Sequence, residues 1–101
     1  MCGRYVRKTG ALEIAHAFSA VDSGQHLALN FNISPTSDVF ALRANGGEVR
    51  LEVMSWGLVL SWAKDVSRAA SLINARSESV AEKPSFRNLI GRHRCVMPMN
   101  A

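Results

Sequence analysis

Residues 39–54 read VFALRANGGEVRLEVM, and this stretch decides the fold. Apolar and polar residues alternate in the two runs 39–43 and 48–54, which is typical of β-strands with one buried face. Between the runs stands Asn45-Gly46-Gly47, and these residue types readily adopt the positive φ angles of a tight turn. The stretch therefore predicts an antiparallel β-hairpin.

Shorter elements surround the predicted hairpin. Residues 2–7 are expected to be extended. Thr9 can cap a helix that runs to about residue 20, with apolar positions at Leu12, Ile14, Ala15 and Phe18. Further along the chain we expect an extended segment at 32–35, apolar runs at 56–62 and 69–73, single helical turns ending before 84 and over 85–90, and a strand at 94–97. Helices and antiparallel strands mix irregularly, so the predicted fold class is α+β, an irregular mixed domain formed by residues 1–101.

Composition limits the class of protein. The chain has 101 residues, 48% of them apolar and 20% charged, which fits one soluble globular domain rather than a disordered chain. It contains neither an apolar run long enough to span a membrane nor a secretion signal at its start. We therefore expect a protein that is not secreted and does not bind membranes, in the cytoplasm beside the bacterial nucleoid or in a nucleus.

Charge and cysteine content indicate a partner and a redox state. The net charge is +4, and the cations are nine arginines and three lysines, which favours a phosphate-bearing partner such as nucleic acid. Cys2 and Cys95 are too few for a disulfide framework or a four-cysteine zinc site, and both should be reduced. Cys95 lies in a predicted strand, where we expect a buried side chain. We expect neither a metal nor another cofactor.

Cys2 carries the most distinctive chemistry in the sequence. If Met1 is removed, as is expected before a small residue, Cys2 holds a free α-amine with a pKa of about 7.7–8.0 and a thiol with a pKa of about 8.5. The amine can attack an aldehyde to form an imine, and the thiol can then add to that imine, which closes a thiazolidine ring. Ring closure within one residue benefits from a high effective concentration. The alternative is that a cysteine at this position has no chemical role.

Five blocks of the sequence, in this order, resemble the SRAP family, the SOS response-associated peptidases that process abasic sites. They are Met1-Cys2-Gly3-Arg4-Tyr5, Asn32-Ile33-Ser34-Pro35-Thr36, Trp56-Gly57-Leu58 with Ser61-Trp62-Ala63-Lys64, Asn74-Ala75-Arg76-Ser77-Glu78, and residues 81–87 together with Arg94-Cys95-Val96-Met97-Pro98. Each block alone is a weak signal. Together they cover the whole chain and identify it as similar to the N-terminal half of a SRAP domain.

The resemblance implies a protein of the DNA-damage (SOS) response that recognises abasic sites in single-stranded DNA and forms a covalent crosslink through its N-terminal cysteine. An abasic deoxyribose opens to an aldehyde, which matches the chemistry available at Cys2. By the resemblance, Cys2 is the nucleophile and Asn74 lies beside the lesion as a second catalytic residue. The residues implied in DNA binding are Gly3, Arg4, Pro35, Trp56, Asn74, Arg76 and Arg87, with the arginines on phosphates and Trp56 against a base.

The chain also departs from the family pattern. Family domains are about twice as long, and they carry a later glutamate and histidine that assist proton transfer, help that is typically worth about 10²- to 10⁴-fold in rate. These 101 residues contain neither, and Ala101 stands where the family has a glycine. We therefore leave open whether the chain is an active lyase-like or peptidase enzyme. The departure leaves three explanations open: an N-terminal fragment of a longer protein, a natural half that pairs with a complementing C-terminal segment or a second chain, or a degenerate remnant.

Two other functions remain open from the sequence. One is a basic single-stranded DNA-binding module with no covalent step, which should bind with strong salt dependence and ignore the lesion. The other is a cysteine peptidase, which would need a histidine beside Cys2. Purely structural roles also remain possible for single residues. Trp56 and Trp62 can be core residues, Phe86 can be a core anchor beside Arg87, and Asn74 can cap a turn.

Overall fold

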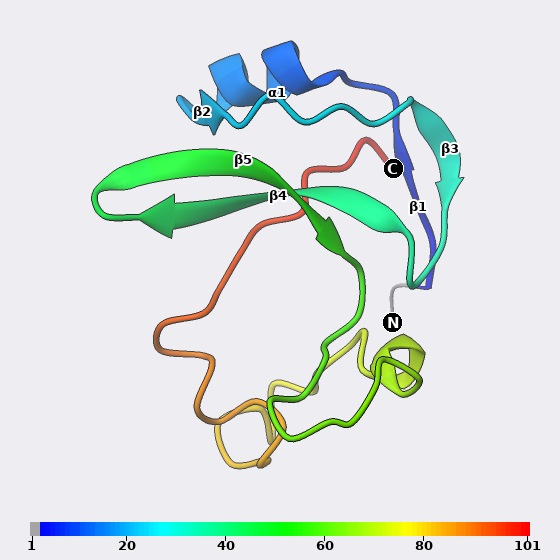
Figure 1. The fold of residues 1–101 in the computed structure, drawn as a ribbon, viewed down its shortest axis with the longest axis vertical. Coiled ribbons are helices and arrows are strands. Elements are labelled where there is room, and N and C mark those ends of the chain that lie inside the picture. Colours follow the sequence, from blue (N-terminus) through cyan, green and yellow to red (C-terminus); the bar gives the residue numbers. More distant parts are fainter. Residues whose placement is uncertain (1–2) are drawn as a thin grey trace.

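The structure is a computed structural model that describes residues 3–101, so Cys2 lies outside the described residues. Its elements in chain order are β1 (Tyr5–Arg7), α1 (Ala11–Ala17), β2 (Val21–Asp22), β3 (Asn30–Ile33), β4 (Asp38–Asn45), β5 (Glu48–Ser55) and the 3₁₀ helix η1 (Ala69–Ser71). Figure 1 shows the strands and α1 at one end of the molecule and the irregular stretch after β5 at the other. Short helices and mixed, partly antiparallel sheets make the fold α+β, which confirms the predicted class.

The predicted hairpin is confirmed in the structure. β4 and β5 pair antiparallel from Asp38 opposite Ser55 to Asn45 opposite Glu48. Gly46 and Gly47 form the two-residue loop with φ angles of 60° and 91°. Positive φ at both loop positions matches the twist of the flanking strands and is easiest for glycine. β2 adds to the other edge of β5 in parallel, which gives the sheet order β2-β5-β4.

The C-terminal residues 96–101 join the two sheets. Val96 exchanges both backbone hydrogen bonds with Leu42 of β4, with N···O distances of 2.8 and 2.9 Å. A few residues later, Asn100 N–H donates to the carbonyl of Val6 at 2.8 Å, and Val6 N–H donates to the carbonyl of Ala101 at 2.7 Å. Because β1 also pairs with β3, residues 96–101 lie between β4 and the β1-β3 pair (Figure 1).

β4 is buried on both faces over Val39, Phe40, Ala41 and Leu42. On one face, Phe40 and Leu42 pack with residues of α1 and β5. On the other face, Val39 packs into a second cluster with β1 and β3 residues. The alternation expected over 39–43 is therefore wrong: residues 39–42 form a continuous apolar run, as a strand covered on both faces requires, and only 48–54 alternate.

The helix α1 is shorter than predicted. It spans Ala11–Ala17, and its N-cap residue is Gly10, with no side-chain cap. Thr9 does not cap it, because its hydroxyl instead exchanges hydrogen bonds with the side-chain amide of Asn100 at 3.1 and 3.4 Å. At the other end Ser19 has a φ of 51°, a left-handed conformation that stops the helix. Of the four predicted apolar positions only Ile14 and Ala15 are buried.

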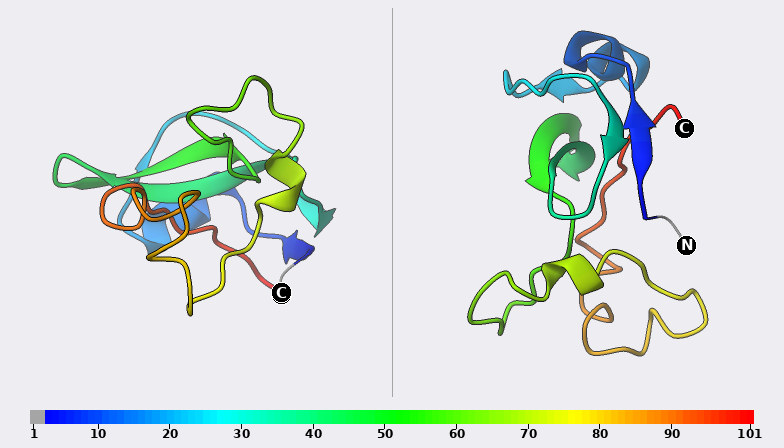
Figure 2. Two further views of the ribbon diagram at one scale, coloured as in Figure 1. Left: turned by 90° about the horizontal axis from the view of Figure 1, so that it is seen from below. Right: turned by 90° about the vertical axis from the view of Figure 1, so that its right-hand side faces the viewer.

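Residues 56–95 contain η1 and a series of turns. Backbone bonds that span three or four residues recur between 76 and 93, as in Val80 N–H to Arg76 C=O at 2.9 Å and His93 N–H to Leu89 C=O at 2.7 Å. They match the single helical turns that the sequence predicts. The predicted strand at 94–97 is reduced to one bridge at Val96. The two views of Figure 2 show this part of the chain, in green to orange, as loops beside the sheets.

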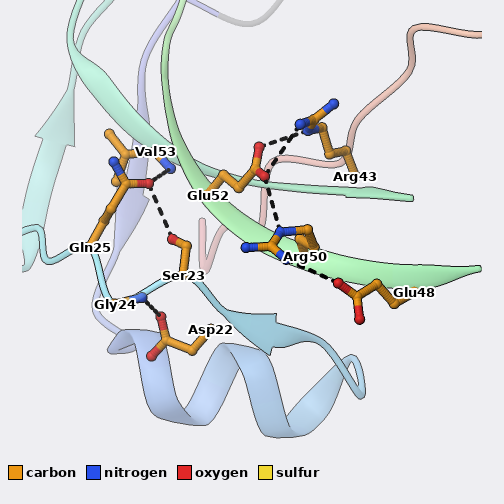
Figure 3. A network of polar contacts seen from close by, with 9 residues as sticks. All are labelled: Asp22, Ser23, Gly24, Gln25, Arg43, Glu48, Arg50, Glu52 and Val53. Atoms are coloured by element: carbon orange, nitrogen blue, oxygen red, sulfur yellow. Dashed lines mark hydrogen bonds and ion pairs between the residues drawn. The ribbon is translucent and has the colours of Figure 1, made fainter. Parts of the chain in front are cut away.

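Charged and polar side chains stabilise the outer surface of the β2-β5-β4 sheet (Figure 3). Arg43 and Glu52 form an ion pair across β4 and β5 at 2.7 Å, and Arg50 lies between Glu48 and Glu52 at 3.0 and 3.4 Å. The hydrogen bonds from Arg43 hold the pKa of Glu52 below its usual value. Gln25 accepts from the backbone of Val53, which ties the loop after β2 to β5.

No helix among residues 3–101 is long and apolar enough to cross a membrane.

Candidate functional site

Some of the predicted site residues belong to or adjoin one small core, which we call the Tyr5–Trp56 cluster. Its buried members are Tyr5, Ile33, Val39 and Trp56, and Ile73 and Met97 pack against them. The rings of Tyr5 and Trp56 meet edge to face, with centroids 5.4 Å apart and planes at 68°. Such aromatic pairs add stability beyond the burial of their area. The cluster therefore fixes four distant parts of the sequence in one place.

The start of the described chain and Asn74 are brought together by this cluster. Arg4 directly precedes Tyr5, and Asn74 directly follows Ile73, so both leave the same core. Gly3, Arg4 and Asn74 are all exposed. Arg4 also donates to the side chain of Asn32 in β3 at 3.4 Å. The predicted nucleophile, Cys2, is two residues from Arg4 but lies outside the described residues.

A tight turn places Pro35 against the same core. The carbonyl of Ser34 accepts from Ser37 N–H at 3.2 Å, and their hydroxyls lie 3.1 Å apart. Two backbone hydrogen bonds then join the turn to Trp56. Thr36 N–H donates to the carbonyl of Trp56 at 2.8 Å, and Trp56 N–H donates to the carbonyl of Ser37 at 2.9 Å. Thr36 has a φ of 70°, a left-handed conformation that costs energy for a β-branched residue. The turn is thus held by Trp56 despite local strain.

Trp56 is a core residue, and the expectation that its face meets a DNA base does not fit this position. The side chain is only 7% exposed and packs against Tyr5. The next residue, Gly57, is needed at its position for a separate structural reason. A Cβ atom on Gly57 would lie 2.6 Å from the carbonyl oxygen of Ala69, and its φ is 139°. Only glycine lets η1 approach this closely, so Trp56 and Gly57 together position the segment that leads to Asn74.

Arg76 and Arg87 lie in exposed turns outside the Tyr5–Trp56 cluster. The carbonyl of Arg76 accepts from Ser79 and Val80 N–H at 3.2 and 2.9 Å, and Arg87 N–H donates to Lys83 C=O at 2.9 Å. Both side chains are exposed, as binding to backbone phosphates requires. The structure therefore brings Gly3, Arg4, Pro35 and Asn74 to one core, but no contact of that core includes Arg76 or Arg87.

A second aromatic residue, Trp62, has the exposure that Trp56 lacks. It is 61% exposed and lines a hollow of about 290 Å³ together with Lys64 and Arg68. An exposed indole beside two cations suits stacking on a base and contact with a phosphate. The sequence signal was the polar run that follows Trp62, which ends the apolar stretch and predicts exposure.

Arg7 is buried, which the sequence analysis did not anticipate. It is 2% exposed, and its guanidinium donates to the carbonyls of Thr9 and Ala28 at 2.8 and 2.6 Å. The guanidinium also lies 4.6 Å from the ring centroid of Phe40, a cation–π contact. Burial lowers the pKa of Arg7, and the nearby Tyr5 opposes this shift. Arg7 therefore fastens β1, and with it the start of the chain, to the loop before β3.

The remaining cysteine and the histidines lie elsewhere. Cys95 is exposed, so the predicted burial of its thiol is wrong. Within residues 92–96 only Val96 pairs with β4, so no paired strand covers Cys95. His16, His26 and His93 are exposed and lie outside the Tyr5–Trp56 cluster. In the described part of the chain, no three histidine, cysteine or carboxylate side chains come together as a metal site requires.

Comparison with other proteins identifies the family. A family model described as SOS response associated peptidase (SRAP) matches residues 1–101. The chain belongs to the SRAP family. This confirms the resemblance on which the site residues were chosen.

Its relatives are similar across the whole chain but are longer. The chain is 32% identical to the abasic site processing protein YoaM of Bacillus subtilis, over all of this chain and 45% of YoaM. It is also 32% identical to the abasic site processing protein YoqW of Bacillus phage SPbeta, of which it covers 46%. A solved structure from Bordetella bronchiseptica matches 99% of this chain and 49% of its own, with 21% identity and a TM-score of 0.74, and shows the shared fold. The chain spans about half the length of these proteins.

Proposed function

We propose that this SRAP chain recognises abasic sites in single-stranded DNA and bonds to them covalently through Cys2. The observation that best supports the proposal is the packing of Tyr5 and Ile73 in one cluster, because Arg4 and Asn74 directly adjoin these two residues in the sequence. The names of relatives such as YoaM support an abasic site as the substrate. The proposal places the protein with damaged DNA, in the bacterial cytoplasm or a nucleus, and in the SOS response.

The covalent step requires a free amine and thiol on Cys2, so Met1 must be removed first. The ring-opened abasic sugar presents an aldehyde. The Cys2 amine attacks the aldehyde carbon, a water molecule leaves, and an imine forms. The thiol sulfur then bonds to the imine carbon while its proton passes to the nitrogen, which closes a five-membered thiazolidine. The overall reaction releases one water and changes no oxidation state.

The described residues supply binding and orientation around that step. The amide of Asn74 can donate to and accept from the hydroxyls of the opened sugar. Arg4, Arg76 and Arg87 bind phosphates on either side of the lesion, which sets the position of the strand without reading its sequence. Around Gly3, the position of a Cβ atom has no other heavy atom within 4 Å, which leaves room for a sugar next to Cys2.

A non-covalent single-stranded DNA module is the second candidate, and the exposure of Trp62 favours it. Stacking on an indole flanked by Lys64 and Arg68 requires no lesion. Binding of this kind would weaken steeply with salt and would be equal for intact and abasic strands. A peptidase ranks last, because a thiol nucleophile needs a base within hydrogen-bond reach and no described histidine lies in the Tyr5–Trp56 cluster.

The test is a denaturing gel. The chain is incubated with a single-stranded oligonucleotide that holds one abasic site, and with the same strand left intact. We expect a crosslinked species that forms slowly, survives denaturation and appears only with the abasic strand. The Cys2→Ala variant should not form this species. Asn74→Ala should slow its formation by about tenfold to a hundredfold, which is a typical loss for a positioning hydrogen bond to a reacting group. An equal shift with Cys2→Ala would overturn the proposal.

A further inference from the structure

The strand β3 carries an irregularity beside the start of the described chain. In the pairing of β1 with β3, Tyr5 lies opposite Ile33 and Arg7 lies opposite Asn30. One residue of β1 therefore faces the two residues 31–32 of β3, which is the arrangement of a β-bulge. Bulges are common beside functional sites, because the extra residue changes the direction of a side chain. The two residues in the bulge are therefore candidates for a role at the site.

A side-chain hydrogen bond fixes the backbone of the bulge. The side-chain oxygen of Asn30 accepts from Asn32 N–H at 2.8 Å. A bond from an asparagine side chain to the backbone two residues later mimics a backbone turn, so it holds the strand in its bulged course. The position of Asn32 is therefore set within β3 itself.

The side chain of Asn32 contacts Arg4. Their sequence neighbours Tyr5 and Ile33 both belong to the Tyr5–Trp56 cluster. Because successive side chains of a strand alternate between its faces, Arg4 and Asn32 lie on the face away from the cluster, and both are exposed. β1 and β3 run side by side (Figure 1), and a long side chain can reach a diagonal neighbour on the adjacent strand. The guanidinium of Arg4 donates through Nη1 to the side-chain oxygen of Asn32 at 3.4 Å.

The chemistry of this contact suits a cation that keeps its charge for a ligand. An amide oxygen accepts a hydrogen bond without carrying a charge, so Asn32 orients the guanidinium and does not neutralise it. A guanidinium has five N–H donors, so a bond through Nη1 is compatible with a contact of the same group to a phosphate. By contrast, Arg43 on the sheet forms an ion pair with Glu52, which offsets its charge. An amide partner therefore favours phosphate binding by Arg4 in a way that a carboxylate partner would not.

We infer that Asn32 is a positioning residue that orients the guanidinium of Arg4 toward a phosphate of the bound strand, and that the bulge of β3 holds Asn32 in place for this contact. The inference rests on the proposed function only in that Arg4 binds a phosphate of single-stranded DNA. It does not require the covalent step at Cys2. Binding of an intact strand therefore tests it separately from the formation of the crosslink.

The test measures the affinity of this chain for an intact single-stranded oligonucleotide at several salt concentrations. Each neutralised phosphate contributes about 0.7 to the slope of log affinity against log salt concentration. Asn32→Asp places a carboxylate against Arg4 that competes with the phosphate, so the slope should be smaller by about 0.7 than in the wild-type chain. In the Arg4→Ala chain, Asn32→Asp should have no further effect on the slope.

Two further variants separate charge from orientation. The control Asn45→Asp makes the same change of charge at the tip of the β4-β5 hairpin, away from β1 and β3 (Figure 1), and should keep the wild-type slope. Asn32→Ala removes the acceptor but keeps the charge of Arg4, so it should also keep the wild-type slope. Its crosslinking to an abasic strand should nevertheless be about tenfold slower, because a small misplacement of a reacting group costs much of the rate. A purely structural role of Asn32 would not separate the slope from the rate in this way.

Four results would overturn the inference. They are equal slopes for Asn32→Asp and Asn45→Asp, an effect of Asn32→Asp that is the same with and without Arg4, crosslinking by Asn32→Ala at the wild-type rate, and no binding of the intact strand by the wild-type chain. If the expected slopes occur but no variant or wild-type chain forms a crosslink, the covalent step is contradicted and the role of Asn32 stands.

Circular dichroism shows whether the variants keep their fold. If Asn32→Asp unfolds, the NMR signals of the Asn32 side-chain amide decide. They should shift when the intact strand is added to the wild-type chain and not when it is added to Arg4→Ala. No shift in the wild-type chain, or an equal shift in both chains, would contradict the positioning role.

Discussion

Replacing Gly57 with alanine tests how the structure positions Asn74. The added Cβ would lie 2.6 Å from the carbonyl oxygen and 3.0 Å from the carbonyl carbon of Ala69, so the backbone of η1 must move. The φ of 139° adds strain for any residue with a Cβ. Overpacking and strain together should lower the free energy of unfolding by about 3 kcal/mol. For a domain of this size that corresponds to a fall in Tm of roughly 12 to 24 °C.

Two other glycines separate the contribution of backbone strain from that of overpacking. Gly24 has a φ of 82° but open space around it, so Gly24→Ala should show strain alone, about 1–2 kcal/mol. Gly91 has neither constraint, and Gly91→Ala should stay within about 0.5 kcal/mol. Urea unfolding followed by circular dichroism measures all three, and the crosslinking gel then reports whether Gly57→Ala slows capture at temperatures where it stays folded. A Gly57→Ala variant as stable as Gly24→Ala would refute the close contact with η1.

Three further predictions concern the clusters around the site. Trp56→Ala should lower the free energy of unfolding by about 3–5 kcal/mol, whereas Trp62→Ala should change it by less than about 0.5 kcal/mol. Trp62→Ala should instead weaken the salt-dependent binding of an intact strand. Unfolding curves measure the stability of the two variants, and fluorescence titrations at two salt concentrations measure the binding. Arg7→Met removes the donor to the carbonyls of Thr9 and Ala28 and should cost about 2–4 kcal/mol in urea unfolding, with Arg7→Lys in between. Equal stability of the wild-type chain and both variants would contradict the role of Arg7 in fastening β1. The pKa of Glu52 is lowered in the folded state, so its contribution to stability is present above its ordinary pKa and is lost as pH falls through the lower folded value; unfolding from pH 7 to pH 3 should show the difference between the wild-type chain and Glu52→Gln shrinking to nothing.

Local sequence signals predicted the elements whose causes are local. The hairpin followed from Gly46 and Gly47, which set the turn, and from the apolar runs on each side. The fold class followed from the irregular mixture of short elements. The N-cap at Thr9 was wrong because its hydroxyl is bonded to Asn100, 91 residues away, and no local pattern reports such a contact.

The sequence named candidate site residues, but it could not give their arrangement in space. The polar run after Trp62 is a local signal of exposure, whereas the burial of Trp56 depends on its packing against Tyr5, which is distant in the sequence. Arg7 reads as one more surface cation, although the carbonyls of Thr9 and Ala28 hold it inside the fold. Cys95 has the sequence context of a strand, yet the pairing with β4 is limited to the bridge between Leu42 and Val96, and Cys95 is exposed. In each case the deciding contact joins parts of the chain that are distant in sequence.

The most direct test of the central claim is the intact mass of the chain after incubation with a single-stranded abasic oligonucleotide. We predict one species whose mass equals that of the chain without Met1 plus the oligonucleotide minus one water, with the attachment mapped to Cys2. A variant with one extra residue before Cys2 keeps the thiol but removes the free amine there, and it should form no stable adduct. An adduct of equal yield in that variant, or one mapped to Cys95, would contradict ring formation at the chain terminus.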